Sequence, residues 1–178
     1  LKHTTDHALR LQIISQQLDA FRGTFIRQTM FAEFELEIHR RVEAGEALTA
    51  DRFTAIYRDL VTRYFGPDVA IDEQIGLEWA RIPHFYRGFY VYQYATGIAA
   101  ATALARQILD EGQPAVDRYL DFLRGGSSKI SIDLLRGAGV DMTSPAPVEA
   151  AMQFFGRLVD QLEAELRKDG NGRMKDEG

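Results

Sequence analysis

Apolar residues recur three or four positions apart over long stretches of this chain, and no other feature of the sequence constrains its fold as much. This spacing places side chains on one face of an α-helix. The clearest rows are Leu11, Ile14, Leu18, Phe21 and Phe25 near the beginning, and Val148, Met152, Phe155, Val159, Leu162 and Leu166 near the end. No stretch alternates apolar and polar residues convincingly, as a half-buried strand does. The pattern therefore predicts an all-α fold in which several helices pack as an array.

Glycine, proline and N-cap residues divide the chain into successive helices. We expect helix up to Gly45, then at about 49–64, 89–109, 114–124 and 131–136, and a last helix after Pro147. Thr49 is a suitable N-cap, and Gly66-Pro67 ends the helix that it begins. Residues 68–83 fit no element clearly, because they end in a proline, which disfavours helix at the residue before it.

The acidic composition of the chain excludes several classes of partner. Its 21 Lys and Arg against 26 Asp and Glu give a net charge of −5, which favours neither nucleic acid nor an anionic membrane. There is no cysteine, so disulfides and thiolate zinc sites are excluded.

No stretch has the pattern of a signal peptide or a membrane span, and we expect a cytoplasmic protein. We expect one helical domain over residues 1–168 and a flexible polar tail over residues 169–178.

The residues most suited to chemistry lie in one segment, IPHFYRGFYVYQYATG (residues 82–97). Its polar aromatic residues are His84, Tyr86, Tyr90, Tyr92 and Tyr94. Leucine and phenylalanine would serve core packing better, because each buried phenol needs a hydrogen-bond partner. A histidine and phenols along one wall can donate hydrogen bonds to an oxyanion or bind peptide carbonyls. An aromatic packing seam without chemistry explains the composition equally well. If the whole segment is helical, Tyr86, Tyr90 and Tyr94 share one face.

Two other groupings contain metal-binding residue types, and neither predicts a metal site. His3 and His7 have the spacing of two zinc ligands on one helix face, but no glutamate follows the first histidine to activate water. Glu35 and His39 also share a helix face, and an ordinary helix ion pair explains such a charged face better. We therefore assign no metal ligand to this chain.

The segment IPHFYRGFYVYQYATG resembles the His-and-Tyr segment of the M3 family of zinc metallopeptidases, specifically that of the oligoendopeptidase F type. Two further stretches agree in order and spacing, LDAFRGTFIRQTMFAEFELEIH (residues 18–39) and FLRGGSSKISIDLLRGAGVDM (residues 122–142). The amphipathic last helix agrees as well, so the resemblance covers about residues 9–166. It implies an almost wholly helical fold, whose two halves enclose a deep channel where short, unstructured peptides are hydrolysed.

The resemblance also implies a zinc ion in the complete enzyme. In this family, two histidines of an H-E-x-x-H helix and a glutamate on the following helix hold the metal. None of these ligands is present here, so the chain resembles a C-terminal fragment of the catalytic region. Its expected partners are short peptides and the missing N-terminal part of that region. We expect the fragment to be inactive alone. The alternative is a non-catalytic helical module for packing or interaction.

What the resemblance carries over to this chain is the wall of the cleft opposite the zinc. His84 matches the family histidine that contacts substrate, and Tyr92 matches the tyrosine that stabilises the tetrahedral oxyanion. Tyr86 and Tyr90 match as substrate-binding residues, and a shift of one position in the alignment exchanges their roles. Tyr94 is interpreted as structural.

Overall fold

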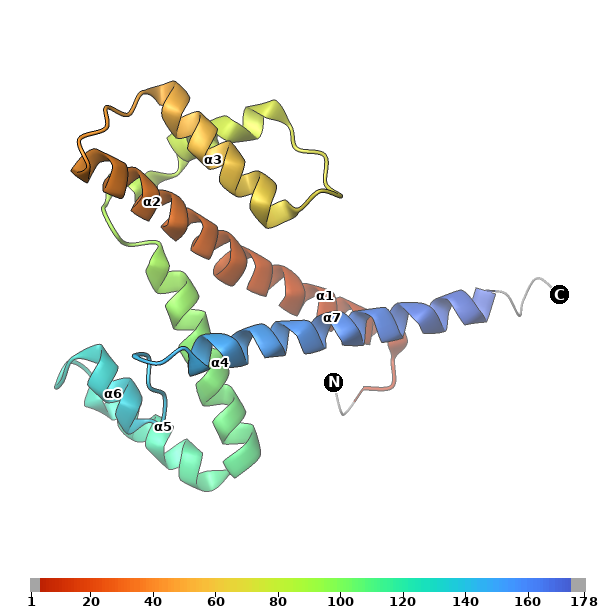
Figure 1. Cartoon of the computed structure of the whole chain (residues 1–178). Coiled ribbons are helices and arrows are strands. Elements are labelled where there is room, and N and C mark those ends of the chain that lie inside the picture. The colour runs from red at the N-terminus through yellow and green to blue at the C-terminus, as the bar shows by residue number, and fades with distance from the viewer. Residues whose placement is uncertain (1–3, 174–178) are drawn as a thin grey trace. The chain divides into compact units, whose positions relative to one another are not determined.

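Every regular element in the described part of the chain, residues 4–173 of a computed structural model, is helical (Figure 1). In chain order these are α1 (His7–Phe21), the π-helical turn η1 (Arg22–Ile26), α2 (Arg27–Glu43), α3 (Ala50–Phe65), the 3₁₀ helices η2 (Glu73–Arg81) and η3 (Pro83–Tyr86), α4 (Tyr92–Glu111), α5 (Gln113–Gly125), α6 (Ser131–Gly137) and α7 (Ala146–Arg173). The prediction of an all-α fold is confirmed over these residues. None of these helices is long and apolar enough to cross a lipid bilayer.

The helix ends follow the local chemistry of the chain. Thr49 caps α3 by accepting a hydrogen bond from the Arg52 N–H at 3.3 Å, and Gly66 ends the helix at a φ of 77°. Residues 68–83, which the sequence left unassigned, contain η2. Helix α7 continues through Arg173, so residues 169–173 of the expected polar tail are helical, and residues 174–178 lie outside the described part.

Contacts within the chain group the described residues into two compact units. One unit combines the chain up to Gly23 with the chain from Thr96 onward, and the other is Thr24–Ala95. Both lie largely within the range 1–168. That they work as one domain stays a prediction.

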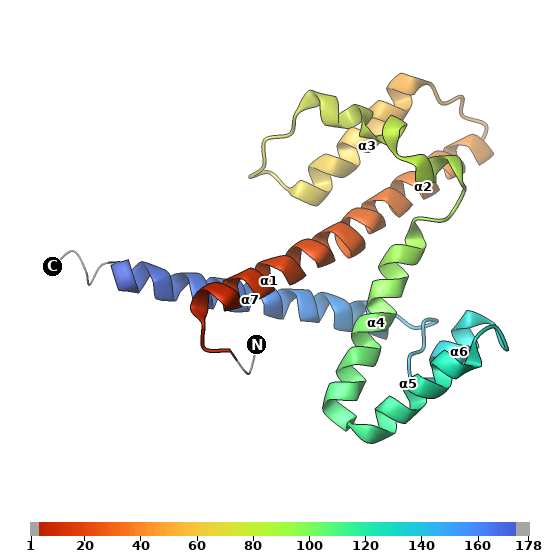
Figure 2. The ribbon, with the colours of Figure 1, turned by 180° about the vertical axis from the view of Figure 1, so that it is seen from behind.

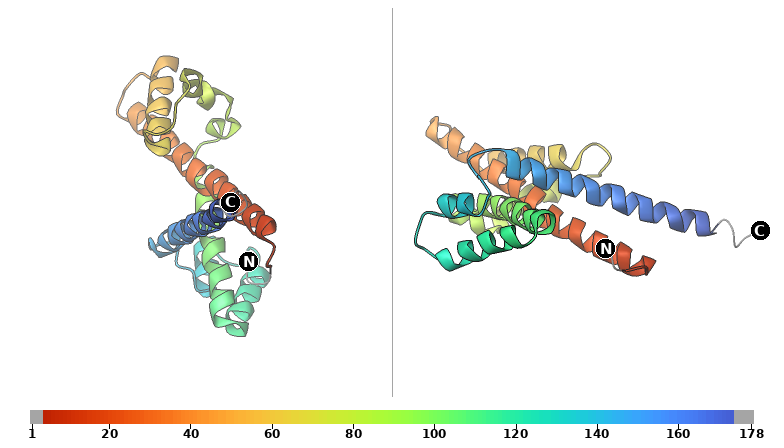
Figure 3. Two further views of the ribbon diagram at one scale, coloured as in Figure 1. Left: turned by 90° about the vertical axis from the view of Figure 1, so that its right-hand side faces the viewer. Right: turned by 90° about the horizontal axis from the view of Figure 1, so that it is seen from below.

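In the unit formed by the two ends of the chain, α1 and α7 lie side by side (Figures 1 and 3). The ring of Phe21 stacks on that of Phe155 with centroids 5.3 Å apart. Farther along, α5 turns back beside α6 (Figure 2). Buried Leu104 and Val140 form a second core there, against which Tyr119 packs.

The unit Thr24–Ala95 is built from α2, α3 and η2 around an aromatic core. Its buried members are Met30, Phe31, Phe34, Tyr57, Leu60, Val61 and Val91. Met30 and Phe34 belong to a row at steps of four, which places both on one face of α2. Phe85 of η3 packs against Phe31 and Phe34, with ring centroids 5.5 and 5.0 Å apart. Phe85, which directly follows His84, is thereby anchored to the aromatic core.

Candidate functional site

The segment of residues 82–97 is not one continuous helix. The short helix η3 ends at Tyr86, and five residues separate it from α4. Among these, Phe89 has a φ of 60°, in the left-handed region that costs a residue other than glycine about 1 kcal/mol or more. Helix α4 therefore begins later than residue 89, where the sequence placed it, and Tyr86, Tyr90 and Tyr94 do not share one helix face.

His84 lies in a cluster with two phenols. Its Nε2 is 3.0 Å from the hydroxyl oxygen of Tyr94, and its ring stacks on that of Tyr90 with centroids 5.6 Å apart. The Tyr90 and Tyr94 rings meet edge to face, also at 5.6 Å. Burial and the neighbouring Tyr90 phenol raise the pKa of Tyr94 above its ordinary value. Tyr94 thus remains a neutral phenol at neutral pH, able to donate or accept a hydrogen bond.

Tyr86, Tyr90 and Tyr92 are exposed to solvent to different degrees. The Tyr86 hydroxyl donates to the backbone oxygen of Ala80 at 3.0 Å, while 74% of the residue is exposed. Tyr92 occupies the first turn of α4 and is 49% exposed. Tyr90, although stacked on His84, is 43% exposed. An exposed phenol beside a histidine, such as that of Tyr90, can hydrogen-bond to a molecule that lies along this surface.

The turn that carries Tyr90 is held from α2. The Glu35 carboxylate is buried, at 2% exposure, and accepts a hydrogen bond from the main-chain N–H of Phe89 at 2.8 Å. One helical turn farther along α2, the ring of His39 lies 4.5 Å from that of Phe89. Glu35 and His39 therefore share a face, as their spacing predicts. In place of the expected helix ion pair, Glu35 bonds to the main chain of Phe89 and His39 packs against its ring.

A second buried carboxylate supports the chain before His84. Glu78 of η2 accepts hydrogen bonds from the Tyr57 hydroxyl at 2.7 Å and from Arg27 and Arg81. Burial opposes its ionisation, but the Tyr57 hydrogen bond and the two positive charges prevail and lower the pKa of Glu78. Burial and the Glu78 carboxylate raise the pKa of Tyr57. The network ties together α2, α3 and η2.

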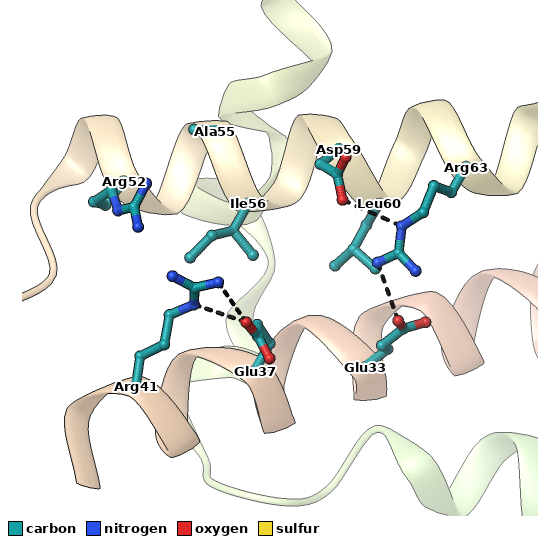
Figure 4. Close-up of a pocket in the computed structure, with 9 residues that line it drawn as sticks. All are labelled: Glu33, Glu37, Arg41, Arg52, Ala55, Ile56, Asp59, Leu60 and Arg63. Carbon is teal, nitrogen blue, oxygen red and sulfur yellow. Dashed lines mark hydrogen bonds and ion pairs between the residues drawn. The ribbon is translucent and has the colours of Figure 1, made fainter. Parts of the chain in front are cut away.

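A surface groove of about 330 Å³ between α2 and α3 is lined largely by charged side chains (Figure 4). Its lining residues are Glu33, Glu37, Arg41, Arg52, Ala55, Ile56, Asp59, Leu60 and Arg63. Arg41 pairs with Glu37, and Arg63 pairs with both Glu33 and Asp59. Glu37 thus pairs with Arg41 on its own helix, whereas Glu33 pairs with Arg63 of α3, and both charges are compensated within the groove.

No cluster of three or more His, Asp or Glu side chains within residues 4–173 is arranged to hold a metal ion. Of the two N-terminal histidines, His3 lies outside the described residues. The Nδ1 of His7 is 3.0 Å from a carboxylate oxygen of Glu165 on α7.

The structure brings together some of the residues that the sequence singled out, and adds others. His84 and Tyr90 are in contact, whereas the hydroxyl of Tyr86 is turned to the backbone of η2. Tyr94, which the sequence treated as structural, is hydrogen-bonded to His84. Glu35 was missed as a support, although it follows Phe31 by four positions and therefore lies on the buried face of α2.

The described residues form an all-helical fold in which a histidine packs between two phenols, and comparison with known proteins identifies the family. Residues 1–154 match the model of peptidase family M3, and the chain belongs to this family.

Several similar proteins are named oligopeptidase or oligoendopeptidase F. The chain is 56% identical over 168 residues to the oligopeptidase PepF of Bacillus subtilis (strain 168), covering 94% of this chain and 25% of that protein. It is 41% identical to the plasmid oligoendopeptidase F of Lactococcus lactis subsp. cremoris, covering 94% of this chain and 28% of that protein. The crystal structure of oligoendopeptidase-F from Enterococcus faecium superimposes with a TM-score of 0.91 at 41% identity, covering 94% of this chain and 32% of that one. The chain thus spans about a quarter to a third of the length of these relatives.

Proposed function

We propose that this chain forms part of a zinc metalloendopeptidase that hydrolyses short oligopeptides. Its family and the names of its relatives support the reaction class. Because the chain spans only part of those proteins, we propose that it acts together with the remaining part of their catalytic region. A cytoplasmic location also stays a prediction.

The proposed contribution of this chain is one wall of the peptide-binding cleft. Tyr92 donates its phenolic hydrogen to the oxyanion that forms when water attacks the peptide carbonyl, and His84 contacts the same substrate. Tyr86 and Tyr90 bind the peptide on either side. The observation that carries this proposal is the packing of His84 against the exposed Tyr90 and the half-buried Tyr94, since it orients the histidine before substrate arrives. Donors fixed in advance stabilise developing charge without reorganisation during the reaction.

The metal belongs to another part of the proposed enzyme. The described residues do not fit a zinc site, so we derive no ligand from this chain. In a metallopeptidase, zinc lowers the pKa of a bound water and polarises the carbonyl. The role left to this chain is to bind the peptide and to stabilise the charge opposite the attacking water.

Tyr92→Phe in the full-length peptidase tests this role. The variant keeps the ring and removes the donor, so kcat should fall about 10²–10³-fold, the usual loss for one oxyanion donor. The measurement is steady-state hydrolysis of a short fluorogenic peptide. Tyr64→Phe is the matched control, because that phenol is bonded to Glu33, and it should leave kcat unchanged. If Tyr92→Phe kept the full kcat, Tyr92 would be a packing residue, and the non-catalytic interpretation of this aromatic segment would gain support.

A further inference from the structure

We propose that Glu35 is a positioning residue for this site, because its buried carboxylate fixes the turn at Phe89 from which Tyr90 and Tyr92 extend. The inference rests on the proposed function, since it assigns Glu35 an effect on the residues that would bind the peptide and its oxyanion.

The burial of Glu35 is the first observation. A carboxylate that is 2% exposed is costly to keep unless it is hydrogen-bonded. Its oxygen accepts from the main-chain N–H of Phe89, 54 positions farther along the chain. A bond to a backbone N–H depends on the path of the chain and not on the side chain at that position. Glu35 therefore specifies the conformation of the turn.

The backbone of Phe89 is the second observation. Its φ of 60° is unusual for a residue with a side chain, and such a conformation persists only where the surroundings impose it. The preceding residue is a glycine, yet Phe89 carries the positive φ. Helix α2 holds Phe89 at two points, its main chain through Glu35 and its ring through His39. These contacts supply the constraint that the conformation needs.

The position of Phe89 in the chain links this constraint to the site. Tyr90 follows directly and stacks on His84, Val91 is completely buried, and Tyr92 begins α4. Relaxation of Phe89 to a negative φ would redirect the chain between His84 and both tyrosines. A misplacement of about 1 Å in a catalytic group can cost about 10²-fold in rate. Glu35 would thus act through the geometry of other residues, without touching substrate.

The test compares Glu35→Leu and Glu35→Gln in the full-length peptidase. Leucine removes the acceptor, so kcat should fall about 10- to 100-fold, and KM should rise by a smaller factor because Tyr90 is displaced as well. Glutamine keeps a carbonyl oxygen that can accept from Phe89, so its kcat should stay within about threefold. Glu33→Leu is the matched control on the same helix, because Glu33 is bonded to Arg63 and Tyr64 of α3, and its kcat should be unchanged.

Hydrogen exchange of the main-chain amides at residues 87–91 supplies a readout that does not depend on activity. Exchange at Phe89 should be faster in Glu35→Leu than in the wild type, and unchanged in Glu33→Leu. If Glu35→Leu does not fold, Glu35→Asp takes its place, since its shorter side chain withdraws the carboxylate from Phe89 and should lower kcat about tenfold.

Unchanged exchange at Phe89, or an unchanged kcat in Glu35→Leu, would overturn the inference. Loss of kcat in Glu35→Gln as large as in Glu35→Leu would also overturn it, since the acceptor is retained. A different result would contradict the proposed function, namely full activity in both Tyr92→Phe and His84→Ala. In that case the exchange of Phe89 still reports whether Glu35 fixes the turn.

Discussion

At the scale of single residues, the buried charges reveal how distant parts of the chain are held together. The buried carboxylates among the described residues are Glu35, Glu78 and Glu165. Each is hydrogen-bonded to a group remote in sequence: the Phe89 N–H, the Tyr57 hydroxyl and the Arg10 side chain. Leaving such a group buried without its partner costs free energy. Each buried glutamate therefore favours one arrangement of two segments over the alternatives.

A second variant of the proposed site tests His84 at this scale. In the full-length peptidase, His84→Ala should lower kcat/KM about 10- to 100-fold, the rate equivalent of losing one or two substrate hydrogen bonds. Zinc content, measured by atomic emission on the purified protein, should equal that of the wild type, because the described part of this chain supplies no metal site. Loss of zinc in His84→Ala would count against the assignment of the ligands to another part of the enzyme. His7→Ala is the control histidine variant and should keep wild-type kinetics, since His7 contacts Glu165.

At the scale of elements, α1 and α7 are joined by an apolar contact and by a buried ion pair. Phe21 stacks on Phe155, and Glu165 accepts hydrogen bonds from Arg10 and Lys168 and contacts His7. Of these contacts, the Lys168 hydrogen bond has the largest effect on the pKa of Glu165. Acting with Arg10 and His7 against the effect of burial, it lowers the pKa of Glu165 from 4.5 to about 2. We therefore expect the pairing of the two helices to weaken in acid.

The lowered pKa of Glu165 determines in which direction the stability of the folded chain changes with pH. The unfolded chain binds the Glu165 proton at higher pH than the folded chain does, so the stabilisation is complete above pH 4.5 and is lost as the pH falls toward about 2. Glu165→Gln should therefore be less stable than the wild type at pH 7, and the difference in urea midpoint, followed by circular dichroism, should shrink over that range. Glu163→Gln is the control on the same helix, because Glu163 is exposed and bonded only loosely to Arg167. A Glu165→Gln difference that stayed constant from pH 5 to pH 2 would contradict the prediction.

At the scale of the whole molecule, the chain carries one wall of a proposed site and no described metal centre. The relatives are three to four times as long, as the 25–32% coverage of those proteins indicates. Chemistry that needs a metal-activated water cannot be completed by phenols and a histidine alone. Activity is accordingly proposed for the assembled enzyme.

This assignment predicts the behaviour of the 178-residue chain by itself. Isothermal titration with zinc should show no tight one-to-one binding, because a zinc site needs three or four ligands in a set geometry. A fluorogenic peptide should remain uncleaved under conditions in which the full-length peptidase hydrolyses it. Tight stoichiometric zinc binding by the isolated chain would show that the ligands had been assigned to the wrong part of the protein.

The sequence alone determined the helices, because their determinants are local. Apolar residues at steps of three and four define the buried faces of α1 and α2, and Thr49 with Gly66 set the ends of α3. In α7 the buried positions are instead Ala151, Leu158 and Glu165. Short sequence motifs were also enough to indicate the family and to single out the segment around His84. The same reasoning misplaced the beginning of α4, because the neighbouring residues give no sign of the positive φ of Phe89, whose main-chain N–H is bonded to Glu35 of α2.

Only the tertiary structure decided which of the singled-out residues meet. Tyr94 joins His84, and Tyr86 does not, because the chain turns between η3 and α4 instead of continuing as one helix. Glu35 reaches Phe89 across 54 positions, and no periodic pattern encodes such a contact. Side-chain direction at a site depends on the path of the backbone, and that path is fixed here by hydrogen bonds between distant segments. The sequence therefore identifies the candidate residues, whereas their arrangement depends on the folded chain.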